Sequence, residues 1–503
     1  MSGKNSAPDF DVLIVGAGIS GIGMAAHMQM QCPDRSYAIL EGRDKIGGTW
    51  DLFRYPGVRS DSDMHTLGYS FEPWTDEESI AGGDAILSYL HKVARKYDIE
   101  RHIRFGHRVL TADWDSQDAC WRLVLQTAEG EQTLSARFLY LGSGYYDYDQ
   151  PHDAGFDTSQ YTGKVVHPQF WPDDLDYAGK EVVVIGSGAT AVTIVPAMTD
   201  AAKRVTMLQR TPTWMFGLPS RDWIANALRT VLPHDVAYRI TRWKNVLVTD
   251  WGFKRARGKP DKFSKMLTKR LEKSLPADAD MADFTPPYGP WDQRLCAVPD
   301  DDLFVAMKAG KARVMTDRIA QFKGNTIELE SGKTIPADVV VTATGLTLAM
   351  TGKIAITMDG APVDFTQHFY YKGCMFSNVP NLAVVFGYLN ASWTLRADLN
   401  ADFICRVLNR MKDGGNAIAV PVLTPQQEAE LEEDDIFDFS SGYIQRGRHL
   451  MPKSAVGYPW RLNQDYRADR KFMAEDVYDG ILTFHEGPNA AQSVADDMLE
   501  PAE

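Results

Sequence analysis

The chain has 503 residues, of which 44% are hydrophobic and 24% charged, an ordinary composition for a globular protein with room for about three domains. The net charge of −14 argues against nucleic acid as a partner, because binding a phosphate backbone needs a basic surface. The five cysteines are scattered without a CxxC pair, so we expect free thiols in a cytoplasmic protein, and neither a disulfide framework nor a metal site.

The apolar segment 12–30 is not expected to be a secretion signal. Asp9 and Asp11 stand where such a signal carries basic residues, and four glycines interrupt the run. The sequence also contains no uninterrupted apolar stretch of the roughly 18 residues that a membrane-spanning helix needs. We therefore interpret the segment as a strand, a turn and a helix.

The first glycine-rich turn lies within this segment. The run 11–15 is apolar without polar alternation, as in a buried parallel strand, and Gly16-Ala17-Gly18-Ile19-Ser20-Gly21 follows it directly. In this GxGxxG pattern the glycines allow a tight turn, and the following helix offers N–H donors to a pyrophosphate. Glu41 ends the next apolar run, where a carboxylate can accept hydrogen bonds from a ribose. These features predict a dinucleotide site, the alternative being a turn kept only for packing.

A second unit of the same kind begins at residue 182. The apolar run 182–185 leads into Gly186-Ser187-Gly188-Ala189-Thr190-Ala191, a GxGxxA turn, and then into a helical stretch. The next apolar run ends in Gln209-Arg210-Thr211, without an acid in the place that Glu41 takes in the first unit. Arg210 there suits the 2′-phosphate of NADPH, although a solvated arginine at a strand end is the alternative. Two such turns predict two dinucleotides.

The stretch between the two turns resembles a known family. Tyr161-x-Gly163-x-x-x-His167-x-x-x-Trp171-Pro172 is similar to the fingerprint of the Baeyer–Villiger monooxygenases, F-x-G-x-x-x-H-x-x-x-W-[PD], with Tyr in place of Phe. The segments 47–64, 186–192, 288–299, 343–345, 387–394 and 458–466 also resemble this flavin-containing monooxygenase family, and in particular its ethionamide-activating group from mycobacteria. The resemblance therefore covers most of the chain.

The resemblance implies an α/β fold with two Rossmann-like dinucleotide-binding domains. A discontinuous FAD-binding domain is expected at 1–150 and 340–503. An NADP-binding domain at 160–340 is expected to be inserted into it, and to carry a helical insertion at about 215–285. No obligate protein partner is evident.

The activity implied by the resemblance is that of an FAD- and NADPH-dependent monooxygenase. It would use O2 to convert a small apolar ketone into an ester or lactone through a flavin peroxide. Oxygenation of sulfides, thioamides or amines by the same flavin peroxide is the alternative, since the family also contains such enzymes. A flavin disulfide reductase is not expected without a cysteine pair, and retention of Asp61, Arg210 and Arg294 argues against a non-catalytic flavoprotein at the membrane surface.

The resemblance also implies roles for single residues. Positions that match FAD contacts are Gly16, Gly18, Ser20, Gly21, Glu41, Thr49, Trp50, Asp51, Leu52, Asp61 and Val109. Positions that match NADP contacts are Arg59, Ser60, Asp61, Gly186, Ser187, Gly188, Ala189, Thr190, Ala191, Val192, Arg210 and Thr211. Arg294 matches the arginine that assists oxygenation, and His167 matches the histidine thought to couple domain movement to cofactor position. A guanidinium suits this step because it stays charged and stabilises developing negative charge, and Asp61 is the natural residue to orient it.

Residues 254–273 form a strongly basic stretch in an acidic chain. Lys254–Lys273 holds nine basic and two acidic residues, and its apolar side chains at 263, 266, 267 and 271 fall on one helical face. A basic amphipathic helix can lie on an anionic membrane surface, here the inner face of the cell membrane. The alternative, which the sequence favours, is a helix packed over the active site with a solvated outer face.

Overall fold

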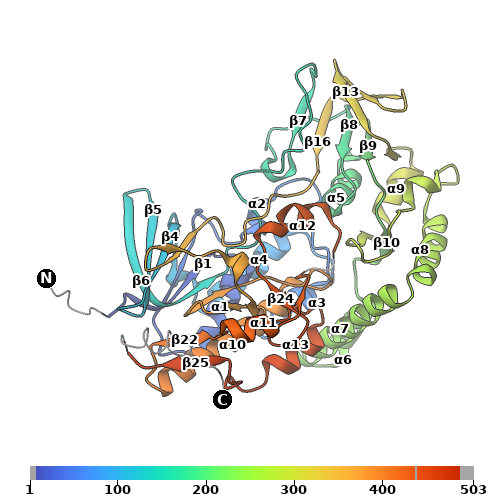
Figure 1. Ribbon diagram of the computed structural model, residues 1–503. Coiled ribbons are helices and arrows are strands. Elements are labelled where there is room, and N and C mark those ends of the chain that lie inside the picture. The colour runs from blue at the N-terminus through green and yellow to red at the C-terminus, as the bar shows by residue number, and fades with distance from the viewer. Residues whose placement is uncertain (1–6, 437–438, 488–503) are drawn as a thin grey trace.

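The structure, a computed structural model, describes residues 7–436 and 439–487 and consists of two lobes flanked by a helical arm (Figure 1). The larger lobe is built on a nine-stranded sheet. Its strands lie in the order β18 (Ala361–Pro362), β17 (Ala355–Met358), β4 (Arg108–Asp115), β5 (Cys120–Thr127), β6 (Gly130–Leu141), β1 (Phe10–Val15), β2 (Tyr37–Leu40) and β3 (Ile103–Arg104), and β21 (Leu382–Val384) also pairs with β6.

The centre of this sheet is buried on both faces. Strand β1 pairs in parallel with β2 and β6, and this explains why its sequence is a continuous apolar run. Val12 and Ile14 point to a core formed with helices α1 (Ile19–Gln31), α4 (Gly83–Lys96) and α10 (Trp393–Asp413), whereas Leu13 and Val15 point to a second core on the side of β4, β5 and β6. The helices thus cover one face of the sheet.

The smaller lobe repeats this plan with a five-stranded, all-parallel sheet. Its order is β12 (Ala312–Thr316), β9 (Arg204–Gln209), β8 (Glu181–Ile185), β16 (Val339–Thr342) and β7 (Lys164–Val166). Helices α5 (Ala189–Met198) and α9 (Asp302–Lys308) share one core with this sheet. The other face packs on a small antiparallel sheet of β13 (Ile319–Lys323), β14 (Thr326–Leu329) and β15 (Thr334–Pro336). The predicted α/β fold with two Rossmann-like units is confirmed.

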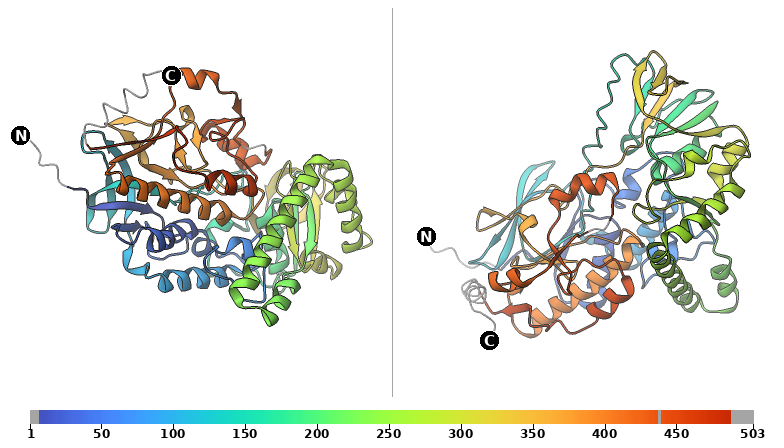
Figure 2. Two further views of the ribbon diagram at one scale, coloured as in Figure 1. Left: turned by 90° about the horizontal axis from the view of Figure 1, so that it is seen from below. Right: turned by 45° about the vertical axis from the view of Figure 1, so that its right-hand side comes forward.

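The helical arm falls within the predicted insertion. It comprises α6 (Trp223–Val231), α7 (His234–Gly258) and α8 (Pro260–Ser274), and it runs along one side of both lobes (Figure 2). The apolar side of α8 faces inward, because Leu267 and Leu271 are buried and Leu271 belongs to the core of the smaller lobe. Within residues 7–436 and 439–487, no helix has the length and apolar character needed to cross a bilayer.

Shorter elements connect these parts. The helices are α2 (Thr49–Leu52), α3 (Met64–Leu67), α11 (Pro425–Glu430), α12 (Gly442–Gly447) and α13 (Tyr466–Met473), with single 3₁₀ turns at Glu100–His102, Pro168–Phe170, Met281–Phe284, Phe365–Gln367 and Arg448–Leu450. The strands form four pairs: β10 (Met215–Leu218) with β11 (Cys296–Pro299), β19 (Tyr370–Tyr371) with β20 (Met375–Phe376), β22 (Ile418–Pro421) with β25 (Leu482–His485), and β23 (Glu433–Asp434) with β24 (Ser454–Ala455).

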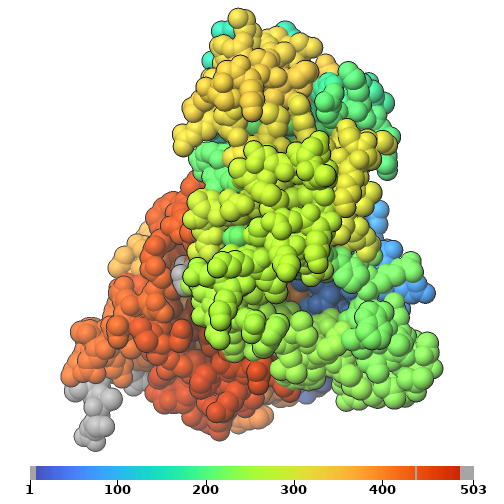
Figure 3. Space-filling model, turned by 90° about the vertical axis from the view of Figure 1, so that its right-hand side faces the viewer, coloured from blue at the N-terminus to red at the C-terminus, as the bar shows by residue number. Residues whose placement is uncertain are grey.

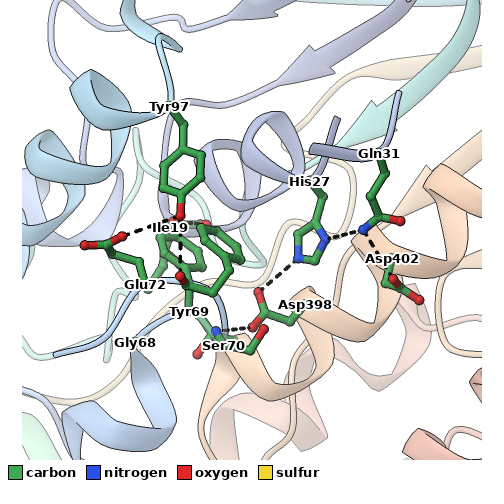
Figure 4. A network of polar contacts seen from close by, with 12 residues as sticks. Ile19, His27, Gln31, Gly68, Tyr69, Ser70, Glu72, Tyr97, Asp398 and Asp402 are labelled. Carbon is green, nitrogen blue, oxygen red and sulfur yellow. Dashed lines mark hydrogen bonds and ion pairs between the residues drawn. The ribbon is translucent and has the colours of Figure 1, made fainter. Parts of the chain in front are cut away.

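A buried cation fixes the arm to the larger lobe. Arg242 of α7 donates hydrogen bonds to three backbone carbonyls of the segment 65–68, at 2.7–3.2 Å. Its second terminal nitrogen lies 3.5 Å from a carboxylate oxygen of Asp398 on α10. Asp398 also accepts a hydrogen bond from the backbone of Ser70 and lies 3.5 Å from Nε2 of His27 on α1 (Figure 4). One carboxylate therefore links α1, α7 and α10.

Replacing Arg242 with Ala should destabilise the protein strongly. The change leaves Asp398 buried without its guanidinium partner and several carbonyls unsatisfied, and the loss of one partner of a buried pair costs about 3–5 kcal/mol. Arg239→Ala on the same helix is the control, because its pair with Asp235 is exposed and costs well under ~1 kcal/mol. We expect thermal unfolding followed by circular dichroism to show a midpoint several degrees lower for the first variant. Equal midpoints would contradict the anchoring role.

Candidate functional site

A cavity of about 1410 Å³ lies where the lobes meet. It exceeds the ~300–1,000 Å³ that is usual for the site of one small molecule, so it can hold more than one ligand. Its wall includes both glycine turns, the loop after β6, parts of α6 and α7, and α12 from the C-terminal part of the chain. Figure 1 shows α2 and α12 close to this junction.

Both glycine turns present a helix N-terminus to this cavity. Gly18 caps α1 and Gly188 caps α5, and neither cap carries a side-chain hydrogen bond. The first N–H groups of a helix have no partner within the helix, and together with the helix dipole they attract an anion. No atom lies within 4 Å of the place where a β-carbon on Gly188 would stand, so a ligand can approach the backbone there. The two turns therefore fit two phosphate-bearing ligands.

The other glycines of the turns are needed for packing. Gly16 has a φ of +94°, and a β-carbon on Gly21 would lie 1.9 Å from the Gly16 carbonyl oxygen. Gly186 has a φ of +140°, and its β-carbon would lie 2.3 Å from the carbonyl oxygen of Ala343. A side chain at Gly21 would push helix α1 away from the turn, and one at Gly186 would push the turn away from the segment after β16.

The structure divides the predicted site residues into two sets. The cavity wall contains Gly18, Ser20, Thr49, Trp50, Arg59, Asp61, Gly186, Ser187, Gly188, Ala189, Thr190, Arg210, Thr211 and Arg294. The other predicted residues do not line the cavity, and they are Gly16, Gly21, Glu41, Asp51, Leu52, Ser60, Val109, His167, Ala191 and Val192. They can support the site only through residues that they contact.

Glu41 and Asp51 illustrate this supporting position. The Glu41 carboxylate accepts hydrogen bonds from the backbone N–H of Ala17 at 2.7 Å and of Arg43 at 2.9 Å, which orders the first turn. Asp51 is 2% exposed and forms ion pairs with Arg43 at 2.6 Å and with Arg54 at 2.7 Å. The neighbouring Thr49 instead faces the cavity.

An ion pair joins the lobes at the cavity wall. A terminal nitrogen of Arg294 lies 3.6 Å from a carboxylate oxygen of Asp61, and Nε of Arg294 donates to the carbonyl of Leu389 at 3.0 Å. The Asp61 side chain is 52% exposed, into a cavity that protein surrounds. Desolvation by these surroundings raises the pKa of Asp61, although the charges of Arg294 and Arg59 oppose the shift.

The charge of Arg294 is stabilised by its neighbours. Burial alone would lower the pKa of the Arg294 guanidinium, but Tyr443, Tyr145 and Asp61 outweigh it and the pKa is raised. The other arginine near Asp61, Arg59, forms a closer ion pair with Asp302, at 2.6 Å. Arg294 is thus a permanent cation whose terminal nitrogens are open to the cavity.

His167 lies at the junction of the lobes. Its Nδ1 accepts a hydrogen bond from the backbone of Gln169 at 3.2 Å, whereas its Nε2 is buried and has no hydrogen-bond partner among the described residues. Burial lowers the pKa of His167. The Gln169 side chain donates to the carbonyl of Asp147 at 2.7 Å, so the fingerprint segment ties the smaller lobe to the loop after β6.

Sequence reasoning missed two arginines on the wall near the second turn. Arg446 comes from the short helix α12, and burial together with the charge of Arg210 lowers the pKa of its guanidinium. Arg318 follows β12, the strand beside β9, and also lines the cavity. No periodicity or motif marks either residue. Three guanidiniums around one turn suit a ligand with several phosphates.

Comparisons with known proteins agree with this geometry. The family model described as pyridine nucleotide-disulphide oxidoreductase matches residues 13–246. The chain is 48% identical over 472 residues to the FAD-containing monooxygenase EthA of Mycobacterium tuberculosis, a match covering 93% of this chain and 96% of that protein. It is 46% identical over 479 residues to the probable FAD-binding monooxygenase AlmA of Acinetobacter baylyi, covering 94% and 96%.

Solved structures share the fold. An oxidized steroid monooxygenase bound to NADP has a TM-score of 0.76 at 23% identity, covering 95% of this chain and 100% of that one. OTEMO in complex with FAD and NADP has a TM-score of 0.74 at 20% identity, with the same coverage. At these identities the likeness concerns the fold.

An experiment can distinguish the glycines that packing requires from the glycine that leaves room for a ligand. Gly21→Ala should lower the midpoint of thermal unfolding by several degrees, because the new β-carbon clashes with the Gly16 carbonyl. Gly188→Ala is the matched control, since its β-carbon meets no atom within 4 Å and the midpoint should stay unchanged. Circular dichroism melts of both variants without added nucleotide measure this. A stable Gly21→Ala variant would show that the first turn can relax.

Proposed function

We infer that this chain, which belongs to the FAD-containing monooxygenases that include EthA of Mycobacterium tuberculosis, is an NADPH-dependent flavin monooxygenase. The two uncapped helix N-termini and the size of the cavity fit FAD at the first turn and NADPH at the second. When bound, FAD reduced by NADPH supplies the activated oxygen atom that comes from O2. The resemblance to Baeyer–Villiger monooxygenases found in the sequence extends to the fold.

We propose that the reaction is a Baeyer–Villiger oxidation, in which one oxygen atom of O2 enters next to a ketone carbonyl and gives an ester or lactone. The observation that carries this proposal is the Arg294 guanidinium, which faces the cavity while Asp61 and the Leu389 carbonyl hold it in place. Attack on a ketone places negative charge on the carbonyl oxygen, and a preorganised cation in an enclosed site stabilises that charge.

The wall near Arg294 suits an apolar substrate. Trp291 and Phe253 contact each other edge to face with ring centroids 5.4 Å apart, and Val246 and Leu395 also line this part of the cavity. Such side chains offer an apolar substrate a surface from which water is excluded. A small apolar ketone fits these conditions.

The remaining residues of the proposed site would bind the two cofactors or support the residues that bind them. The first turn, Ser20, Thr49, Trp50 and the supporting Glu41 would hold FAD. The second turn, Thr211 and Arg210 would hold NADPH, with Arg446 beside them. We propose that His167 transmits the position of the smaller lobe, because it does not line the cavity and it binds the backbone of Gln169, whose side chain contacts the loop after β6.

Arg294→Ala tests the proposed reaction. We expect the variant to keep FAD and still oxidise NADPH, but to form roughly 10²–10³-fold less ester from a panel of linear and cyclic ketones, because the fixed cation is lost. Gas chromatography of the products and a hydrogen peroxide assay measure the two outcomes. Arg122→Ala on β5, outside the cavity, is the control.

An unchanged ester yield in Arg294→Ala would remove this residue from the mechanism. The same panel should include thioethers, because sulfur oxygenation places no charge on a substrate carbonyl and should depend less on Arg294. Formation of sulfoxides without any ester in the wild-type protein would favour S-oxygenation as the main activity and contradict the ketone proposal.

Arg210→Ala should raise the KM for NADPH about tenfold or more while changing the KM for NADH little, because a charge-assisted hydrogen bond to the 2′-phosphate is lost. Arg446→Ala should act in the same direction if its guanidinium also meets that phosphate. Steady-state kinetics with both nucleotides measure the ratio. Equal effects on NADPH and NADH would mean that the 2′-phosphate is bound elsewhere.

A further inference from the structure

Apolar side chains gather on the outer surface of the helical arm. Trp223 and Val231 of α6 and Ile240, Trp243, Leu247 and Trp251 of α7 are between 36% and 75% exposed. The four on α7 recur every three or four residues, so they form one stripe along the helix. An exposed apolar stripe of this kind usually marks an interaction site, and Trp243 at its edge also contacts the Tyr466 ring and the Arg470 guanidinium. We call these six residues the arm face.

Basic side chains are concentrated on α8, the helix of the arm that follows α7. Lys259, Lys262, Lys265, Lys269, Arg270 and Lys273, on α8 and at its start, are exposed, and none forms an ion pair with any residue that the structure describes. Helices α6, α7 and α8 all show on the surface in Figure 3, in green to yellow-green. This local positive charge contrasts with the net charge of −14 of the whole chain.

The cavity reaches the surface beside the arm face. Trp223 and Val248 belong to the cavity wall and are nevertheless 73% and 60% exposed. Figure 3 shows a hollow among these helices with residues of the larger lobe at its back. Phe253 lines the same cavity.

We propose that the arm face docks on an anionic lipid bilayer. Trp and Leu side chains that insert beside Lys and Arg are the composition of helices that lie in a membrane interface. Anionic lipid head groups attract the exposed bases of α8, and this local attraction opposes the repulsion between the lipid and the acidic remainder of the protein.

Docking places the mouth of the cavity at the bilayer surface. Apolar substrates that are dissolved in the lipid then reach the cavity without crossing water, and this part of the inference rests on the proposed function. The membrane contact differs from the one that the sequence suggested, because Leu267 and Leu271 of α8 face inward and the apolar contact comes from α6 and α7.

Flotation with lipid vesicles tests the docking. We expect the wild-type protein to float with vesicles of phosphatidylglycerol and phosphatidylcholine at low salt, to bind less at high salt, and to bind pure phosphatidylcholine poorly. The double variant Leu247→Glu and Trp251→Glu should lose at least about tenfold in bound fraction. Val305→Glu, an exposed apolar position on α9, is the matched control and should float like the wild type.

A second comparison tests the charge. The triple variant Lys262→Glu, Lys265→Glu and Lys269→Glu should bind anionic vesicles at least about tenfold less. The triple variant Lys308→Glu, Lys311→Glu and Lys323→Glu makes the same change of net charge on the smaller lobe and should bind like the wild type. Equal losses in both would show that only the overall charge matters and would overturn the docking site.

Other outcomes also decide the question. Failure of the wild-type protein to float at low salt would overturn the proposal, as would a dimer in analytical ultracentrifugation that the Leu247→Glu and Trp251→Glu variant dissociates. NADPH oxidation without vesicles should be unchanged in that variant, because neither residue lines the cavity. Flotation needs no turnover, so a protein that floats but makes no ester would contradict the proposed reaction and leave the docking intact.

Discussion

The arrangement of this protein depends on one electrostatic constraint, which is that two anionic ligands must share one cavity. Each lobe meets it with an uncapped helix N-terminus that faces inward. The arginines on the wall near the second turn add positive charge where a further phosphate has to be held. Glu41 and Asp51 lie near the first turn, where Glu41 accepts backbone hydrogen bonds and Asp51 is paired with two arginines. Among the described residues, the cavity wall carries eight Arg or Lys and six Asp or Glu side chains, so it has a small positive formal charge in a chain that is strongly acidic.

The proposed catalytic cation, Arg294, is held by contacts from both lobes. Arg294 belongs to the smaller lobe. Its Nε donates a hydrogen bond to the carbonyl of Leu389 in the larger lobe, and a terminal nitrogen is paired with Asp61 at the cavity wall. The position of the guanidinium therefore depends on the relative placement of the two lobes.

Much of this organisation could be predicted from the sequence, because it is local in the chain. The turns at Gly16 and Gly186 follow apolar strands and precede helices, and strand, turn and helix are each specified by adjacent residues. The position of Arg446 could not be predicted. Helix α12 is short, and it reaches the cavity only because the C-terminal segment packs against Gly345, which follows β16. The stripe on α7 was also missed, because the buried Arg242 and the half-buried Lys244 interrupt its apolar pattern and α8 shows the stronger amphipathic signal.

The arm has a mechanical consequence for the two lobes. Arg242 anchors α7 to the larger lobe, and Leu271 anchors α8 to the smaller one. The arm therefore connects the lobes in addition to the chain segments that run between them. Between these anchors α7 ends at Gly258 and α8 begins at Pro260. A change in the angle between the lobes would therefore bend the arm between these two anchors, where the backbone from Gly258 to Pro260 joins the two helices.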